Sequence, residues 1–189
     1  MENPRKIVTV IGAGFWGSTL AAVVARNQHQ VRLWCRRSLE SLASVVGDAD
    51  IIISAVSMPG VSPISEQLQQ LELSPNVILV TATKGLDTLT TRTPSQIWQA
   101  ALPDHSIVVL SGPNLSQEIR QGLPAATATA SENMAAAKIV QEAFSCDSFR
   151  VYVNADPLGT ELGGTLKNIM AIAAGVCDGL HLGTNAKAA

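Results

Sequence analysis

The chain has 189 residues, of which 47% are hydrophobic and 15% are charged, so it is too apolar for a disordered protein and long enough to bury a core. A formal net charge of −2 provides no basic field, which argues against a nucleic-acid partner. The apolar runs are short and interrupted by Gly and Pro, which excludes a membrane span.

The cysteines and histidines argue against disulfides and metal sites. Cys35, Cys146 and Cys177 lie far apart and form no CxxC pair, which is typical of reduced thiols in a cytosol. The histidines have no metal-ligand spacing. Because the N-terminal segment MENPRK is polar, it leaves no room for the apolar part of a signal peptide. We therefore expect a cytoplasmic protein without a metal.

The stretch from Lys6 to Gly17 carries the strongest motif. A run of β-branched residues predicts a buried parallel strand, and Gly12, Gly14 and Gly17 follow it. In this dinucleotide fingerprint the three glycines permit a tight turn, close approach of the cofactor pyrophosphate, and close packing of the next helix, respectively. A helix over residues 18–25 would point its free N–H groups at the phosphates.

A second strand over residues 30–34 ends at Cys35-Arg36-Arg37. Folds that prefer NAD place an acidic residue near this strand end, whereas arginine accommodates the 2′-phosphate of NADP. Arg36 and Arg37 therefore favour NADP, although solvated arginines, or arginine stacked on the adenine of either cofactor, fit the sequence too.

The rest of the first 156 residues alternates between strands and helices. After a short helical link over residues 38–47, we expect strands over residues 51–56, 76–81, 107–110, 125–130 and 149–153, and helices over residues 63–71, 93–101, 115–121 and 133–144. This order predicts an α/β fold of the Rossmann type, with a doubly wound, mostly parallel sheet. Residues 1–156 would form a dinucleotide-binding domain.

Two of these strands end in residues suited to binding. Lys84-Gly85 follows the strand over residues 76–81, where a cation would meet a substrate or cofactor phosphate, although a plain loop lysine would look the same. Ser111-Gly112-Pro113-Asn114 ends the next strand and precedes a helix whose N-terminus could hold an anion.

The composition changes after Asp156-Pro157, and residues 160–179 show one long helical pattern of small and apolar residues. This pattern predicts a largely buried helix. Burial would lower the pKa of Lys167 toward the range of proton exchange near neutral pH, whereas a lysine that extends its amine to the surface is the alternative. Residues 157–189 would begin a second, helical domain.

Taken together, the chain resembles the bacterial NAD(P)-dependent glycerol-3-phosphate dehydrogenases, and some details look cyanobacterial. The resemblance covers essentially the whole chain. It rests on V-I-G-A-G-F-W-G (Val10 to Gly17), A-T-K-G-L (Ala82 to Leu86), S-G-P-N (Ser111 to Asn114), G-L-P-A-A (Gly122 to Ala126), F-R-V-Y (Phe149 to Tyr152), E-L-G-G-T-L-K-N (Glu161 to Asn168) and N-A-K-A-A (Asn185 to Ala189).

The resemblance implies roles for individual residues. Lys167 would be the catalytic proton donor and acceptor, and Asn168 would belong to the same site. Lys84 would contact both cofactor and substrate. Gly112 and Asn114 would contact the substrate. The cofactor, NADP or NAD, would be bound by Gly12, Gly14, Phe15, Trp16, Gly17, Arg36, Arg37 and Ser116.

The implied reaction is hydride transfer between the nicotinamide and C2 of dihydroxyacetone phosphate, giving sn-glycerol 3-phosphate for phospholipid synthesis. The link between Arg37 and Gly47 is shorter than in most of the family, which affects the adenine side. The family's helical domain continues beyond the equivalent of Ala189 and supplies an aspartate, an arginine and an asparagine. We therefore expect a truncated all-α domain, cofactor binding, and weak or absent turnover by this chain alone.

Two alternatives remain: a catalytically incomplete nucleotide-binding module, and a reductase of 2-oxoacids or ketopantoate. The pair Lys84 and Lys167 in its context disfavours the second alternative. An apolar helix face without its partner domain would also promote self-association, with a homodimer as one form.

Overall fold

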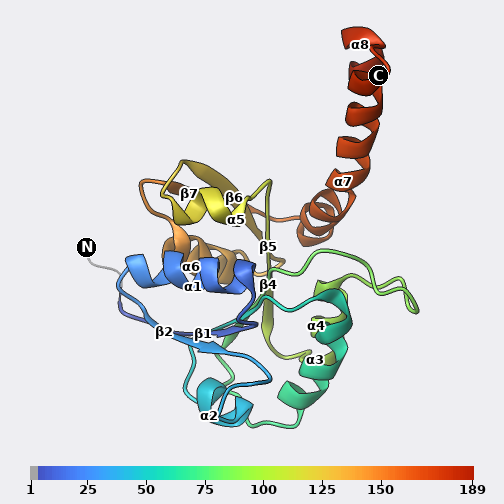
Figure 1. Ribbon diagram of the computed structural model, residues 1–189. Helices are drawn as coiled ribbons and strands as arrows, with labels where there is room; N and C mark the ends of the chain where they lie inside the picture. The colour runs from blue at the N-terminus through green and yellow to red at the C-terminus, as the bar shows by residue number, and fades with distance from the viewer. Residues whose placement is uncertain (1–3) are drawn as a thin grey trace.

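The computed structural model describes residues 4–189, so the first three residues of the polar N-terminal segment lie outside the described part. Strands and helices alternate along the chain (Figure 1). The strands are β1 (Ile7–Ile11), β2 (Gln30–Trp34), β3 (Ile51–Ser54), β4 (Ile78–Thr81), β5 (Ser106–Ser111), β6 (Ala125–Ala130) and β7 (Phe149–Asn154). The helices are α1 (Phe15–Arg26), α2 (Leu42–Val46), α3 (Val61–Gln69), α4 (Pro94–Ala101), α5 (Ser116–Arg120), α6 (Met134–Phe144), α7 (Pro157–Gly179) and α8 (Gly183–Ala188).

All strands form one sheet in the order β2-β1-β3-β4-β5-β6-β7. The first five strands are parallel, β6 is antiparallel to β5, and β7 is parallel to β6. The chain moves outward from β1 in one direction to β2 and in the other to β3. The carboxyl ends of β1 and β3 therefore flank the topological switch point, where ligands bind in folds of this kind. The predicted doubly wound, mostly parallel sheet is confirmed.

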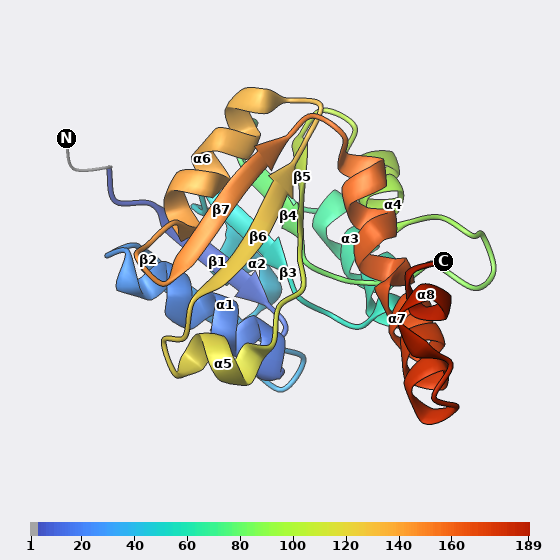
Figure 2. The ribbon, with the colours of Figure 1, turned by 90° about the horizontal axis from the view of Figure 1, so that it is seen from above.

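Helices cover both faces of the sheet (Figure 2). Successive residues of a strand point to opposite faces, so in β3 Ile51 and Ile53 join one apolar cluster and Ile52 joins the other. The first cluster includes residues of α1 and α6, such as Leu20 and Phe144, and the second includes residues of α2, α3 and α4. Strands buried on both sides need apolar residues at every position, which explains their continuous β-branched runs.

Two predicted boundaries were wrong in an informative way. The helix expected to begin at Pro63 begins at Val61, after a 3₁₀ turn at Met58–Gly60, because proline is tolerated in the first turn of a helix, where its missing N–H has no intrahelical partner. The link after Arg37 is helical only over Leu42–Val46, where Ser41 accepts a hydrogen bond from the backbone N–H of Ser44. A serine cap therefore sets this start.

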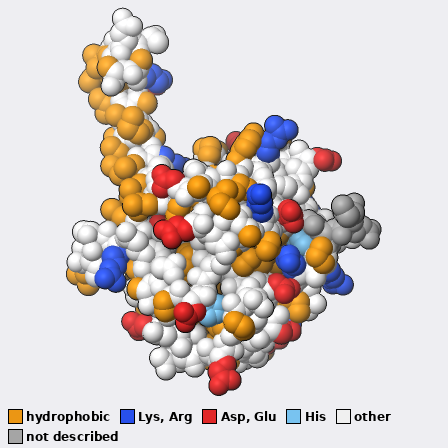
Figure 3. Space-filling model, turned by 180° about the vertical axis from the view of Figure 1, so that it is seen from behind, with side chains coloured by type: hydrophobic (Ala, Val, Ile, Leu, Met, Phe, Trp, Pro, Cys, Tyr) orange, Lys and Arg blue, Asp and Glu red, His pale blue; other side chains and the backbone are white. Residues whose placement is uncertain are grey.

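The long C-terminal helix α7 is mostly exposed, which corrects the expectation of burial. Its apolar residues Ile169, Met170 and Ile172 are 60%, 70% and 68% exposed. In Figure 1 the second half of α7 projects from the α/β layers, and Figure 3 shows apolar side chains along this projection. Helical periodicity identifies an apolar face, but it does not identify what covers that face.

No helix within residues 4–189 is long and apolar enough to cross a membrane. The same residues contain no cluster of three or more His, Cys, Asp or Glu that could hold a metal ion. The three cysteines are free thiols.

Candidate active site

The glycine turn after β1 is packed too tightly for side chains. Gly12 has a φ of +113°, in the region that favours glycine, and its N–H donates to the carbonyl of Trp34 at 2.8 Å. A Cβ on Gly17 would lie 1.8 Å from the carbonyl oxygen of Gly12. Gly12 and Gly17 thus bring β1 and α1 close together, as the fingerprint predicts.

Gly14 differs because its surroundings are empty. A Cβ placed there would meet nothing within 4 Å. Gly14 is the N-cap of α1 and no side chain caps this helix, so the first N–H groups of α1 remain available to a ligand. A pyrophosphate fits this position, because the open space allows close approach and the positive end of the helix dipole favours an anion.

A cleft of about 370 Å³ opens beside this turn. The lining residues follow the carboxyl ends of β3, β4 and β5 or begin α1 and α5; they are Trp16, Ala55, Val56, Ser57, Ala82, Thr83, Lys84, Asn114 and Ser116. The indole N–H of Trp16 donates to the carbonyl of Ala82 at 3.2 Å, which fixes the ring at the wall. Phe15 is 60% exposed, and the guanidinium of Arg120 lies 5.3 Å from its ring centre. The cleft therefore lies where a nicotinamide cofactor would follow the sheet edge.

Helix α7, which carries Lys167, approaches Lys84 at this edge: a Cβ on Gly164 would lie 3.8 Å from Lys84 Cε. The Lys84 ammonium donates to the carbonyl of Gly112 at 3.1 Å. Although part of the Lys84 side chain is exposed, burial of the rest lowers its pKa, and the nearby charge of Lys167 lowers it further. Positive charges near each other at this edge favour an anionic or electron-rich ligand.

The segment after β5 adds a hydrogen-bonding wall. Asn114 donates its Nδ2 to the carbonyl of Ala126 at 2.8 Å, while its Oδ1 is buried without a hydrogen-bond partner in the described residues. A Cβ on Gly112 would lie 2.9 Å from that Oδ1. Lys84, Gly112 and Asn114, predicted together as substrate contacts, therefore do lie together. Asn114 also retains an acceptor that a hydroxyl could satisfy.

Other predicted residues lie outside the cleft lining. Arg36 and Arg37 are exposed beyond the end of β2, and neither has an ion-pair partner within residues 4–189. In folds of this kind the end of the second strand lies on the adenosine side of the bound dinucleotide. Asn168 is exposed on α7, next to Lys167 in the chain.

Sequence reasoning missed the residues that dock α7 on the sheet. Glu161 is buried and hydrogen-bonded to Ser95 at the start of α4. Thr165 accepts a hydrogen bond from the N–H of Gly85 at 3.1 Å, and a Cβ on Gly164 would lie 2.1 Å from Ser111 Oγ. The only local signal was the adjacent pair of glycines in E-L-G-G-T-L-K-N, which indicates close helix packing but names no partner.

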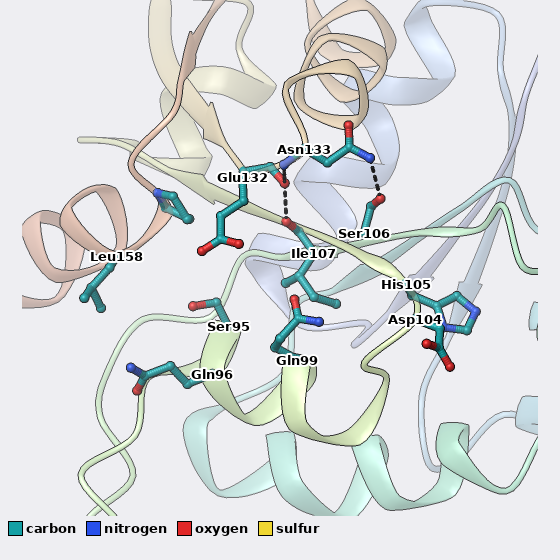
Figure 4. Close-up of a pocket in the computed structure, with 12 residues that line it drawn as sticks. Ser95, Gln96, Gln99, Asp104, His105, Ser106, Ile107, Glu132, Asn133 and Leu158 are labelled. Atoms are coloured by element: carbon teal, nitrogen blue, oxygen red, sulfur yellow. Dashed lines mark hydrogen bonds between the residues drawn. The ribbon is translucent and has the colours of Figure 1, made fainter.

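A second cavity, of about 390 Å³, lies between α4, the start of β5 and the start of α7 (Figure 4). Some of its polar groups satisfy one another: Ser131 Oγ donates to the carbonyl of Ile107, and Asn133 donates to Ser106 Oγ. Both ring nitrogens of His105, by contrast, are buried without a hydrogen-bond partner in the described residues. It is lined by none of the residues expected to bind cofactor or substrate.

Comparisons with known proteins agree with this geometry. Family models for the N-terminus and the C-terminus of NAD-dependent glycerol-3-phosphate dehydrogenase match residues 7–45 and 37–137, and residues 156–189, respectively. Glycerol-3-phosphate dehydrogenases (NAD(P)+) from Synechocystis sp. and Trichormus variabilis are 62% and 60% identical over 188 and 182 residues, covering 100% and 96% of this chain. The chain spans 59% of the length of each of these relatives.

The crystal structure of glycerol-3-phosphate dehydrogenase from Coxiella burnetii superposes with a TM-score of 0.86 at 30% identity. That match covers 97% of this chain and 64% of the Coxiella chain. The likeness therefore extends from β1 through the helix that carries Lys167. With the family models matched over most of the sequence, the chain belongs to the NAD-dependent glycerol-3-phosphate dehydrogenase family.

Proposed function

We propose that this chain contributes the cofactor site and the proton-transferring lysine of a dehydrogenase that interconverts dihydroxyacetone phosphate and sn-glycerol 3-phosphate with NADPH or NADH. The observation that carries the proposal is the packing of α7 against Lys84, which lines the cleft beside the glycine turn: a Cβ on Gly164 would lie 3.8 Å from Lys84 Cε, and Lys167 follows Gly164 by three residues on the same helix. Residues 1–156 would form the dinucleotide-binding domain, and residues 157–189 would begin the helical substrate domain.

The proposed chemistry divides between the bound cofactor and the chain. When bound, the reduced nicotinamide supplies the hydride that reaches C2 of the ketone. Lys167 donates a proton to the C2 oxygen as negative charge develops there, and it accepts that proton back in the reverse direction. Lys84, tethered to the Gly112 carbonyl, stabilises the same charge and binds the substrate or cofactor phosphate. Gly112, Asn114 and Asn168 would hold the substrate.

The remaining predicted residues would hold the cofactor. Gly12, Gly14 and Gly17 accept the pyrophosphate at α1, while Phe15, Trp16 and Ser116 line its path. Arg36 and Arg37 would face the adenosine ribose and its 2′-phosphate. Free thiols and the family role in glycerolipid synthesis support a cytoplasmic location. The exposed apolar face of α7 supports self-association, for example as a homodimer.

The first test measures NADPH binding to this chain by fluorescence, in wild type and in Lys167→Ala. We expect binding in both, because Lys167 serves the substrate. Catalysis is then tested in a chimera that continues this chain with the remaining segment of the Synechocystis relative. Loss of NADPH absorbance on adding dihydroxyacetone phosphate should slow by about 10²–10⁴-fold in Lys167→Ala.

The outcomes separate the alternatives. A folded chain that fails to bind NADPH and NADH contradicts the proposed cofactor site. Turnover in the chimera that Lys167→Ala leaves unchanged supports a nucleotide-binding module whose lysine has no catalytic role. A preference for a non-phosphorylated oxoacid in a substrate panel contradicts the proposed substrate.

A further inference from the structure

Helix α7 inserts one buried carboxylate into the α/β layers, beside the contacts of Gly164 and Thr165. Within α7, all of which the structure describes, Glu161 is the single buried residue, at 2% exposure. Its Oε1 accepts a hydrogen bond from the backbone N–H of Ser95 at 3.0 Å, and its Oε2 accepts one from Ser95 Oγ at 2.5 Å. Burial raises the pKa of Glu161, and its hydrogen bonds from Ser95 oppose that rise.

Glu161 satisfies a donor that α4 leaves free. Thr93 is the N-cap of α4 and forms a capping box with Gln96, and Pro94 at the first position has no N–H. The N–H of Ser95 is therefore the donor of the first turn that needs a partner from elsewhere. A carboxylate also interacts favourably with the positive end of the α4 dipole.

The next turn of α7 faces the lysine loop. Thr165, four residues after Glu161 and so on the same face, accepts the N–H of Gly85. A Cβ on Gly164 would lie 3.8 Å from Lys84 Cε. Lys167 follows Gly164 by three residues and so projects on the same side of the helix. The rotation of α7 that seats Glu161 on Ser95 is thus the rotation that brings Lys167 beside Lys84.

We infer that Glu161 is a positioning residue: by capping α4 it sets the rotation and depth of α7 and so holds Lys167 opposite Lys84. An apolar residue of similar volume would be less costly to bury than a carboxylate, but it would not define direction. The importance of this placement for catalysis rests on the proposed dehydrogenase function. The placement itself can be measured without cofactor or substrate.

The test measures the electrostatic coupling between the two lysines in the purified chain. Lysines are labelled by reductive methylation with ¹³C, which retains their charge, and the Lys84 signal is identified by its loss in Lys84→Arg. The pKa of Lys84 is then titrated by NMR with and without Lys167→Met. Removal of a nearby like charge should raise the pKa of Lys84 in the wild-type background. This rise is the coupling.

The coupling of Lys84 and Lys167 is then measured in two Glu161 variants and in one control variant. Glu161→Leu should reduce the coupling to less than about half, because α7 loses its directional anchor, whereas Glu161→Gln should restore it, because the amide oxygen still accepts the Ser95 N–H. Glu142→Leu removes an exposed glutamate of α6 and should leave the coupling unchanged. A purely structural role would lower thermal stability without changing the coupling.

Full coupling in folded Glu161→Leu overturns the inference, as does loss of coupling in Glu142→Leu. Should Glu161→Leu not fold, Glu161→Asp decides, because its carboxylate is one methylene shorter and reaches the Ser95 N–H only if α7 changes its position. A changed coupling in Glu161→Asp then supports the inference, and an unchanged one overturns it. Because no cofactor or substrate is present, an incorrect dehydrogenase assignment would leave this result intact.

Discussion

Replacing Gly17 by alanine should break the close contact on which the cofactor turn depends. The added Cβ would lie 1.8 Å from the Gly12 carbonyl oxygen and 3.2 Å from Ala55 Cβ. Carbon atoms normally stay about 3.5–4.0 Å from non-bonded neighbours. The atom in the way is backbone, held by the hydrogen bond from Gly12 to Trp34, so no side chain can rotate to relieve the clash.

The magnitude follows from overpacking. Extra methyl groups in a packed interior cost about 1–3 kcal/mol, and a clash with backbone belongs at the upper end. For a chain of this size, about 3 kcal/mol lowers the melting temperature by about 6–12 °C. Gly14→Ala is the matched control, because its Cβ would meet nothing within 4 Å. It should melt within about 2 °C of wild type, since surface changes are usually within ±0.5 kcal/mol.

The two variants should also separate stability from binding. Thermal melts by circular dichroism, without and with NADPH, give both quantities, because a ligand that binds only the folded state raises its melting temperature. Gly14→Ala should lose most of the NADPH-dependent rise, since its methyl group would occupy the space of the pyrophosphate. A Gly17→Ala protein as stable as wild type, or a Gly14→Ala protein with full NADPH stabilisation, would refute this reasoning.

Three further outcomes are expected. Arg36→Ala combined with Arg37→Ala should weaken NADPH binding by at least about tenfold, because a hydrogen bond to a charged group contributes about 1.5–3 kcal/mol. The same double variant should weaken NADH binding less, because NADH has no 2′-phosphate. Equal losses of affinity for the two cofactors in fluorescence titrations would contradict a 2′-phosphate contact. Burial lowers the pKa of Lys84 in the folded chain below the ordinary value of 10.5 that it has in the unfolded chain. At a pH between these two values the unfolded chain binds more protons than the folded one. The free energy of unfolding should therefore rise with pH through that interval. Urea unfolding should show this rise in wild type and a flatter profile in Lys84→Met; identical profiles would count against it. Finally, the wild-type chain should sediment as a dimer or larger species at high concentration, because the apolar face of α7 is exposed. The double variant Ile169→Lys with Met170→Glu should sediment closer to a monomer. A wild-type chain that stays monomeric would argue against self-association through α7.

Features that depend on neighbours in the sequence could be predicted well. The continuous apolar run of β3 indicates a strand buried on both faces, and the alternation of strands with helices indicates the doubly wound sheet. The glycine spacing after β1 likewise has one close-packed solution, which Gly12 and Gly17 adopt. Helix starts were less certain, because Pro63 is compatible with a first turn as well as with a first residue.

The order of the strands and helices and the glycine turn thus follow from periodicity and glycine spacing, which are properties of neighbouring residues. Which residues come together at the site, and which apolar surfaces stay exposed, depends on tertiary contacts. Those contacts bring α7 against Lys84, pair Glu161 with Ser95, and leave the apolar face of α7 uncovered. Such contacts join residues far apart in the chain, so no local pattern can specify them.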